Sequence, residues 1–354
     1  MQESSGAEPQ QDNRKKPGDP VLRTALCRQL GIECPIFSVG FARMAGPDLA
    51  AAVSNAGGCG VLGGTGIRGP FLRERIQRLR TLTKKPFGVN VILAIMRGEE
   101  IEVCLDERVP LVVLFWGDPA PYVRRAHERG VKVFIQVGSI TEAVAAADAG
   151  VDAIIAQGME AGGHVKSTTA LSAIVPAVAD AVKPIPVIAS GGIADGRGLV
   201  AALSLGAQGV SMGTRFVASR ESYIHEDYKA RVVEGTAEDT VYSELFDVGW
   251  SGAPHRVLRN KLVREWEAAG RPPSGQRPGE GSIIGTSTLP DGTVWEIRKY
   301  AAMNPTPDFT GDLEQAPLWA GESCSQVKEI KPAAQIIEDI MRQAQDIVAE
   351  MKRT

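Results

Sequence analysis

The sequence has no surplus of one charge, no long apolar run and few aromatic residues. Its 354 residues include 39 basic and 42 acidic side chains, for a formal net charge of −3. Proteins that bind nucleic acid or an anionic membrane surface usually carry a basic surplus, so neither partner is expected. No apolar stretch approaches the roughly 18 residues of a membrane span. Residues 1–20 are polar, unlike a signal peptide. We therefore predict a cytoplasmic protein whose residues 1–20 form a disordered tail.

Cysteine is also scarce. The five cysteines are odd in number, and none forms a C-x-x-C pair or stands at zinc-ligand spacing from histidine; they are Cys27, Cys34, Cys59, Cys104 and Cys324. A disulfide framework or a structural metal is therefore not expected, and the pattern fits a reducing compartment.

Glycine, in contrast, is abundant. The chain has 39 glycines, roughly 11 % of its residues against an average near 7 %. No three-residue glycine period is present, which excludes a collagen-like structure. The excess indicates positions where the backbone needs positive φ or a close approach to another group.

After residue 20, short apolar β-branched runs alternate with amphipathic or alanine-rich stretches, a pattern typical of successive β-α units. The predicted strands are residues 35–39, 60–63, 87–93, 111–116, 131–137, 153–157, 186–190 and 209–213. The predicted helices are residues 47–55, 70–83, 99–107, 120–129, 141–149, 170–181 and 196–205. Several strands are continuous apolar runs, as expected when both faces of a parallel sheet are covered.

Eight such units in roughly 180 residues predict the α/β class and a (β/α)8 barrel, the TIM barrel. A doubly wound open sheet is the alternative, because one sequence does not reveal strand order. We assign the barrel to residues 21–219 and a smaller, mainly helical cap domain, inserted after the eighth strand, to residues 220–320. Residues 321–354 should return to the barrel as an amphipathic helix over residues 331–352.

Several predicted strands are followed directly by glycines, at the end of a barrel where catalytic groups lie. Residues 64–69 read G-x-G-x-x-G, but no acidic residue ends the next strand, so a tight turn is a simpler interpretation than a dinucleotide site. His164 follows paired glycines after the sixth strand. Imidazole suits acid–base chemistry near neutral pH, so His164 is the candidate catalytic residue, with a structural role as the alternative.

Small residues follow the seventh and eighth strands, and they are Gly191, Gly192, Ser211, Met212, Gly213 and Thr214. Barrels frequently bind a phosphate at these two loops through backbone N–H groups, whereas a tight turn into the next helix is the alternative. FMN, pyridoxal phosphate and a sugar phosphate would each suit such a site. Pyridoxal phosphate needs a Schiff-base lysine, for which Lys166 is the only plausible residue.

Amide side chains near other strand ends favour a flavin among these ligands. Asn90, Gln136 and Gln157 lie in the third, fifth and sixth strands. Their side chains can hydrogen-bond the polar edge of a flavin ring.

Four separated motifs occur in order along the predicted barrel. They are residues 50–58 (AAAVSNAGG), 86–90 (PFGVN), 156–164 (AQGMEAGGH), and 186–194 (PVIASGGIA) with 212–216 (MGTRF). Together they resemble the nitronate monooxygenase family, formerly called 2-nitropropane dioxygenases. The resemblance covers roughly residues 30–222 and implies an FMN-binding TIM barrel with a smaller helical domain over its mouth.

The resemblance also implies roles for individual residues. It places Asn90, Gln157 and Gly162 beside the flavin, Gly191, Gly192 and residues 211–214 around its phosphate, and makes His164 the catalytic base. The implied reaction is oxidation of an alkyl nitronate, a small molecule, by FMN and O2. His164 would deprotonate a neutral nitroalkane or, when protonated, bind the nitronate anion.

Two positions depart from the pattern of the family. Residues 37–41 (FSVGF) replace a Gln-Ala-Pro-Met type segment after the first strand, and Lys166 stands where a small residue is usual. Lys166 either offers a positive charge to a carboxylate-bearing substrate or is a solvated loop lysine.

Other functions remain open at the level of sequence. The same signature occurs in FMN-dependent enoyl-acyl-carrier-protein reductases and NAD(P)H:quinone reductases, so an NAD(P)H-dependent reductase is the alternative. A third hypothesis is a non-catalytic barrel that binds a flavin or a sugar phosphate.

In the cap, Phe246 and Trp250 either form aromatic walls of the pocket or, as we favour, anchor the core. His255, close by in sequence, is a weaker candidate for a second acid–base role. The oligomeric state stays open, with a homo-oligomer among the alternatives.

Overall fold

The computed structural model of the chain describes residues 22–289 and 292–353. The predicted tail, residues 1–20, lies outside the described residues. Within them, no helix combines the length and the apolar character that crossing a membrane would need.

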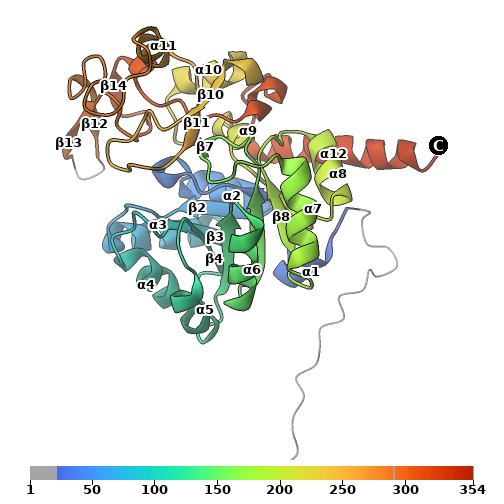
Figure 1. The fold of residues 1–354 in the computed structure, drawn as a ribbon. Helices are drawn as coiled ribbons and strands as arrows, with labels where there is room; N and C mark the ends of the chain where they lie inside the picture. The colour runs from blue at the N-terminus through green and yellow to red at the C-terminus, as the bar shows by residue number, and fades with distance from the viewer. Residues whose placement is uncertain (1–21, 290–291, 354) are drawn as a thin grey trace, which may run out of the picture.

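Eight parallel strands form the barrel (Figure 1). They are β1 (Ile36–Ser38), β2 (Gly60–Gly63), β3 (Phe87–Ile92), β4 (Leu111–Phe115), β5 (Lys132–Val137), β6 (Ala153–Gln157), β8 (Val187–Ser190) and β9 (Gly209–Met212). Each strand pairs in parallel with the next, and β9 pairs with β1. A bridge from Phe37 to Cys59 closes the circle, with the Cys59 N–H donating to the Ile36 carbonyl at 2.9 Å. The predicted barrel is confirmed, and all eight predicted strands lie within one residue of the observed bounds.

The apolar runs of these strands supply two cores, because side chains alternate between the inside and the outside of the barrel. Phe37, Phe134 and Leu111 belong to a buried cluster inside the barrel. A larger cluster lies between the strands and the surrounding helices and includes Val89, Leu114 and Ile154. Burial on both faces explains why the strands read as continuous apolar runs.

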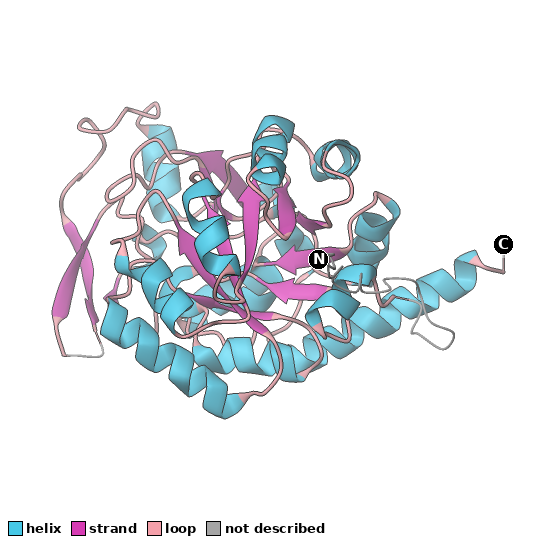
Figure 2. Cartoon of the chain, turned by 90° about the horizontal axis from the view of Figure 1, so that it is seen from below, coloured by secondary structure: helices cyan, strands magenta, loops and turns pink. Residues whose placement is uncertain are grey.

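Helices surround the barrel (Figures 1 and 2). They are α2 (Pro47–Asn55), α3 (Gly69–Leu82), α4 (Glu99–Asp106), α5 (Ala120–His127), α6 (Ile140–Asp148), α7 (Leu171–Ala181) and α8 (Gly196–Ser204), with α1 (Ala25–Leu30) preceding β1. Polar side chains cap some of them; Asp195, for example, accepts from the Gly198 N–H at 3.1 Å at the start of α8. Each of the seven predicted helices is present within two residues.

The last helix, α12 (Ala333–Met351), packs against α8 and α2. Its apolar residues Ile336, Ile337 and Ile340 join the outer core, as their helical spacing predicts. The contact with α8 is close, because a Cβ on Gly196 would lie 2.5 Å from the Ala344 nitrogen. The predicted amphipathic helix is therefore present and completes the outer ring.

The segment after β9 differs from the mainly helical cap that the sequence predicts. It contains α9 (Thr214–Val217), α10 (Glu226–Glu234) and α11 (Lys261–Ala268), with short 3-10 helices at Ala237–Asp239, Leu313–Gln315 and Glu322–Gln326; a further 3-10 turn, Ala42–Met44, follows β1. Its strands form two antiparallel three-stranded sheets, one of which also includes a short strand from the barrel loop after β6. One joins β10 (Thr240–Ser243), β11 (His255–Leu258) and β7 (Gly163–His164), and the other joins β12 (Ile283–Thr288), β13 (Val294–Arg298) and β14 (Phe309–Gly311).

The strands of this cap are hard to predict from the sequence pattern, for a physical reason. Ile283, Val294 and Trp295 are exposed, so β12 and β13 lack the alternation of buried and exposed positions that identifies a half-buried strand. Their β-branched and aromatic residues still favour extended backbone. The short strand β7 pairs with β11, a segment about 90 residues further along the chain, so its formation depends on tertiary contact.

Candidate active site

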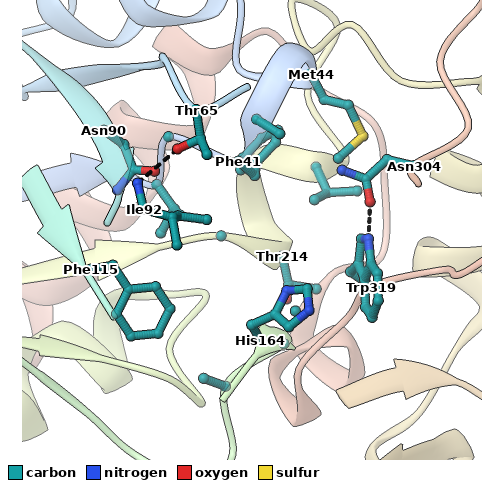
Figure 3. A pocket seen from close by; sticks show the side chains of 18 of the residues that line it. Phe41, Met44, Thr65, Asn90, Ile92, Phe115, His164, Thr214, Asn304 and Trp319 are labelled. Carbon is teal, nitrogen blue, oxygen red and sulfur yellow. Dashed lines mark hydrogen bonds between the residues drawn. The ribbon is translucent and has the colours of Figure 1, made fainter. Parts of the chain in front are cut away.

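A cavity of about 370 Å³ lies at the carboxyl ends of the barrel strands, where the cap covers them (Figure 3). Barrel residues such as Asn90 and His164 line one part of it, and cap residues such as Trp250 and Trp319 line another. Among the described residues that line it, none is Asp, Glu, Lys or Arg. The cavity therefore suits a largely apolar molecule held by a few neutral polar groups.

Two glycines after β8 form one wall of the cavity. Gly191 has φ +115° and Gly192 has φ +68°, a conformation that residues with a Cβ rarely adopt. Within the described part of the chain, the N–H groups of Gly192 and of Gly213, after β9, donate to no acceptor. Free backbone N–H groups on adjacent loops are the donors that hold an anion without a charged side chain.

Thr214 and Gly162 join the barrel to the cap at this wall. The Thr214 hydroxyl oxygen accepts from the Gly321 N–H at 2.9 Å. A Cβ on Gly162 would lie 2.2 Å from the nitrogen of Gly321. The glycine at position 162 is thus required by the close approach of the cap segment.

The three predicted amides lie at the cavity. Asn90 donates from Nδ2 to the Val113 carbonyl at 3.0 Å, which leaves its Oδ1 as an acceptor. Gln136 also lines the cavity. Gln157 is already engaged, because its Nε2 donates to the His164 carbonyl and its Oε1 accepts from the Lys166 N–H, both at 3.0 Å. Gln157 therefore fixes the position of the backbone at His164.

His164 is part-buried and lines the cavity. It lies on β7, directly opposite His255 of β11, and its ring stacks on Trp250 with a centroid distance of 4.0 Å. Its buried Nε2 has no hydrogen-bond partner in the described residues. Burial, and secondarily the neighbouring His255, lowers the pKa of His164 to about 3. The imidazole is therefore neutral at pH 7.

His255 is fully buried, and both of its ring nitrogens are engaged by backbone groups. Nε2 accepts from the Phe246 N–H at 3.1 Å, so Nδ1 carries the proton and donates to the Ala253 carbonyl at 3.0 Å. Burial lowers its pKa to about 4. With no free nitrogen, His255 is not placed for the second acid–base role considered from the sequence.

Two predicted site residues do not line the cavity. Met212 is 1 % exposed and packs in the outer core. Lys166 forms an ion pair with Glu142, and its ammonium group lies 5.8 Å from the centroid of the Trp116 ring. The positive charge suggested for a substrate carboxylate is thus already partnered. The remaining predicted residues line the cavity, and they are Asn90, Gln136, Gln157, Gly162, His164, Gly191, Gly192, Ser211, Gly213 and Thr214.

Some cavity residues were not revealed by the sequence, and they come from two places. Trp319 and Asn304 lie in the later part of the cap. Phe41 and Met44 follow β1; Phe41 belongs to the segment that departs from the family pattern, and Met44 lies just beyond it. Trp250 also lines the cavity, contrary to the favoured interpretation. Phe246, in contrast, is fully buried in the cap core as favoured.

Comparisons with known proteins agree with this fold. The profile of the family described as nitronate monooxygenase matches residues 23–97 and 93–343. A (3aS,4S,5R,7aS)-5-hydroxy-7a-methyl-1-oxo-octahydro-1H-indene-4-carboxyl-CoA dehydrogenase of Rhodococcus jostii (strain RHA1) is 38 % identical over 251 residues, 71 % of this chain and 69 % of that protein.

Solved structures resemble the chain over nearly its whole length. FabK from Thermotoga maritima has 36 % identity and a TM-score of 0.76, covering 94 % of this chain and 99 % of that one. A nitroalkane oxidase from Streptomyces ansochromogenes has 27 % identity and a TM-score of 0.74, covering 91 % of this chain and 99 % of that one.

Proposed function

The chain belongs to the nitronate monooxygenase family, a family of flavin-dependent oxidoreductases. We propose that its cavity binds FMN and that the enzyme oxidises alkyl nitronates with O2. The observation that carries the proposal is the neutral, part-buried His164, with an unpartnered nitrogen, in a cavity whose described lining holds no charged side chain.

The lining residues fit a flavin phosphate and ring. The free N–H groups of Gly192 and Gly213 would hold one phosphate, which supports FMN. The Oδ1 of Asn90 and the amide of Gln136 would bind the polar edge of the ring. When bound, FMN would supply the electron acceptor for the substrate and the reductant for O2.

His164 would act on the substrate through hydrogen bonding. A base with a pKa of about 3 removes a proton from a neutral nitroalkane poorly. A nitronate is already deprotonated, so it needs only a donor for its negatively charged oxygens, and its charge would raise the pKa of the imidazole. The site therefore favours the nitronate anion over the neutral nitroalkane.

A reductase of the enoyl-acyl-carrier-protein type is the second candidate. The apolar lining would also accept an acyl chain, and FabK, of that class, is 36 % identical to this chain. Such an enzyme takes its electrons from NADH or NADPH, which distinguishes the two proposals.

The test is anaerobic reduction of the purified protein, preceded by its visible spectrum. We expect a bound flavin that propyl-2-nitronate bleaches within seconds and that NADH and NADPH leave oxidised. His164→Ala, which removes the donor, should slow bleaching by about 100-fold or more, whereas His127→Ala, on the exposed face of α5, should not. Rapid bleaching by a nicotinamide, with none by the nitronate, would replace this function with the reductase.

A further inference from the structure

The side chain of Asn304 is fixed at the cavity by a single, directional partner. Its Oδ1 accepts a hydrogen bond from Nε1–H of Trp319. An indole N–H can only donate, so the carboxamide must turn its oxygen, and not its nitrogen, toward Trp319. The orientation of the amide is thus dictated by the chemistry of its partner.

Trp319 is itself held firmly. It is 8 % exposed, its ring lies 5.1 Å from that of His164 and 5.0 Å from that of His255, and its carbonyl accepts from the Tyr228 hydroxyl at 2.6 Å. These contacts fix the indole ring between His164 and the cap core. Figure 3 shows Asn304 above the indole ring and His164 beside it.

The nitrogen of Asn304 is consequently offered to the cavity. In Figure 3 it points away from Trp319, toward the side where Phe41 and Met44 lie. Among the described residues no acceptor hydrogen-bonds Nδ2, although Asn304 and these two apolar side chains line the same cavity. On an uncharged wall, an amide with two free N–H groups is a strong site for an acceptor oxygen.

We propose that Asn304 is a specificity-determining residue that donates to an oxygen of the substrate, and that Trp319 is the positioning residue that turns its amide. The inference rests on the proposed function and deepens it: the substrate has an acceptor oxygen, received by Asn304, and an apolar body that packs against the apolar lining of the cavity, such as Phe41 and Met44. A nitronate and a carbonyl compound share this chemistry, and the anion gains more from the donor.

The decisive variant is Asn304→Asp. An aspartate still accepts from the Trp319 N–H but offers oxygens in place of the two donors. We expect the dissociation constant of isobutyrate, an unreactive carboxylate analogue of propyl-2-nitronate, to rise roughly 10- to 100-fold in calorimetric titration of the flavin-loaded protein. Binding of the neutral isobutyramide should be weakened less than binding of isobutyrate. Asn55→Asp, an exposed site whose amide donates to the Leu82 carbonyl, controls for added negative charge.

Trp319→Phe tests the positioning role. It keeps an aromatic ring but removes the N–H, so Asn304 is released and isobutyrate binding should weaken. In the double variant Asn304→Asp/Trp319→Phe, the dissociation constant of isobutyrate should be no higher than in Asn304→Asp alone, because both substitutions act through the same amide. A purely structural role for Trp319 would instead add its own loss in the double variant and would overturn this part of the inference.

The outcomes separate the two proposals. Isobutyrate binding that depends on Asn304, in a protein that nitronate does not reduce, would reject the proposed reaction and support the inference. Unchanged isobutyrate affinity in Asn304→Asp, with flavin absorbance and melting temperature like those of the parent, would overturn the inference, as would no binding of either probe to the parent protein. If Asn304→Asp does not fold, Asn304→Leu provides the same comparison, with the same expected loss.

Discussion

The two buried histidines should make the protein lose stability in mild acid. Burial holds the pKa of His164 at about 3 and that of His255 at about 4, below the value near 6.5 of an unfolded chain. The unfolded state therefore binds protons first as the pH falls. The contribution of these neutral imidazoles to the free energy of unfolding is fully present above about pH 6.5, and it is lost progressively as the pH falls from there toward the native pKa values.

The size of the loss follows from proton linkage. Between pH 7 and pH 5 an unfolded histidine with a pKa near 6.5 gains about 0.7 of a proton, which favours unfolding by about 2 kcal/mol for each group that stays neutral in the native state. Both together give about 4 kcal/mol, a large part of the stability of a typical domain.

Urea unfolding at pH 7 and pH 5, followed by tryptophan fluorescence, measures this difference. His164→Gln removes one titrating group, so the difference between the two pH values should shrink by about 2 kcal/mol relative to the parent protein. An equal pH dependence in the parent and in His164→Gln would refute the account, because it would mean that His164 is protonated as easily in the native state as in the unfolded one.

Two further substitutions test the contacts of the site. Gly162→Ala places a Cβ 2.2 Å from the nitrogen of Gly321, so it should lower the melting temperature by several degrees and weaken flavin retention; Gly46→Ala, where a Cβ meets nothing within 4 Å, is the matched control and should do neither. Lys166→Ala removes an ion pair with Glu142 outside the cavity. It should therefore change turnover of carboxylated and uncarboxylated nitronates equally and by less than about threefold, a loss near 0.5 kcal/mol; a selective loss with the carboxylated substrate would restore a substrate role for Lys166.

Much of the barrel and its phosphate wall could be predicted because the information is local. The apolar runs identify the strands, and Gly191 and Gly192 stand directly after one of them, where a positive φ is needed. His164 was found for the same reason, because it follows paired glycines in the loop after the sixth strand. The physical basis is that a parallel barrel gathers all its strand ends at one face.

The rest of the site could not be read in this way. Asn304 and Trp319 lie in the cap, far along the chain from the strand ends, and no strand or glycine pattern marks them. Met212 was selected with the other residues after the eighth strand, and Lys166 because it stands where a small residue is usual in the family. Their side chains instead join the outer core and an ion pair with Glu142. Direction of a side chain depends on register and packing, which neighbouring residues alone do not determine.

The sequence by itself determined the order and type of the barrel elements, the glycine positions that allow an anion to be held without a charge, and the histidine beside them. These are properties of short segments, set by periodicity and backbone freedom. Only the tertiary structure decided that β11 of the cap pairs with the strand carrying His164, that His255 and three tryptophans surround that imidazole, and that Trp319 turns Asn304 toward the cavity. Those features arise from contacts between distant segments, whose pairing becomes favourable only once the barrel has brought them together.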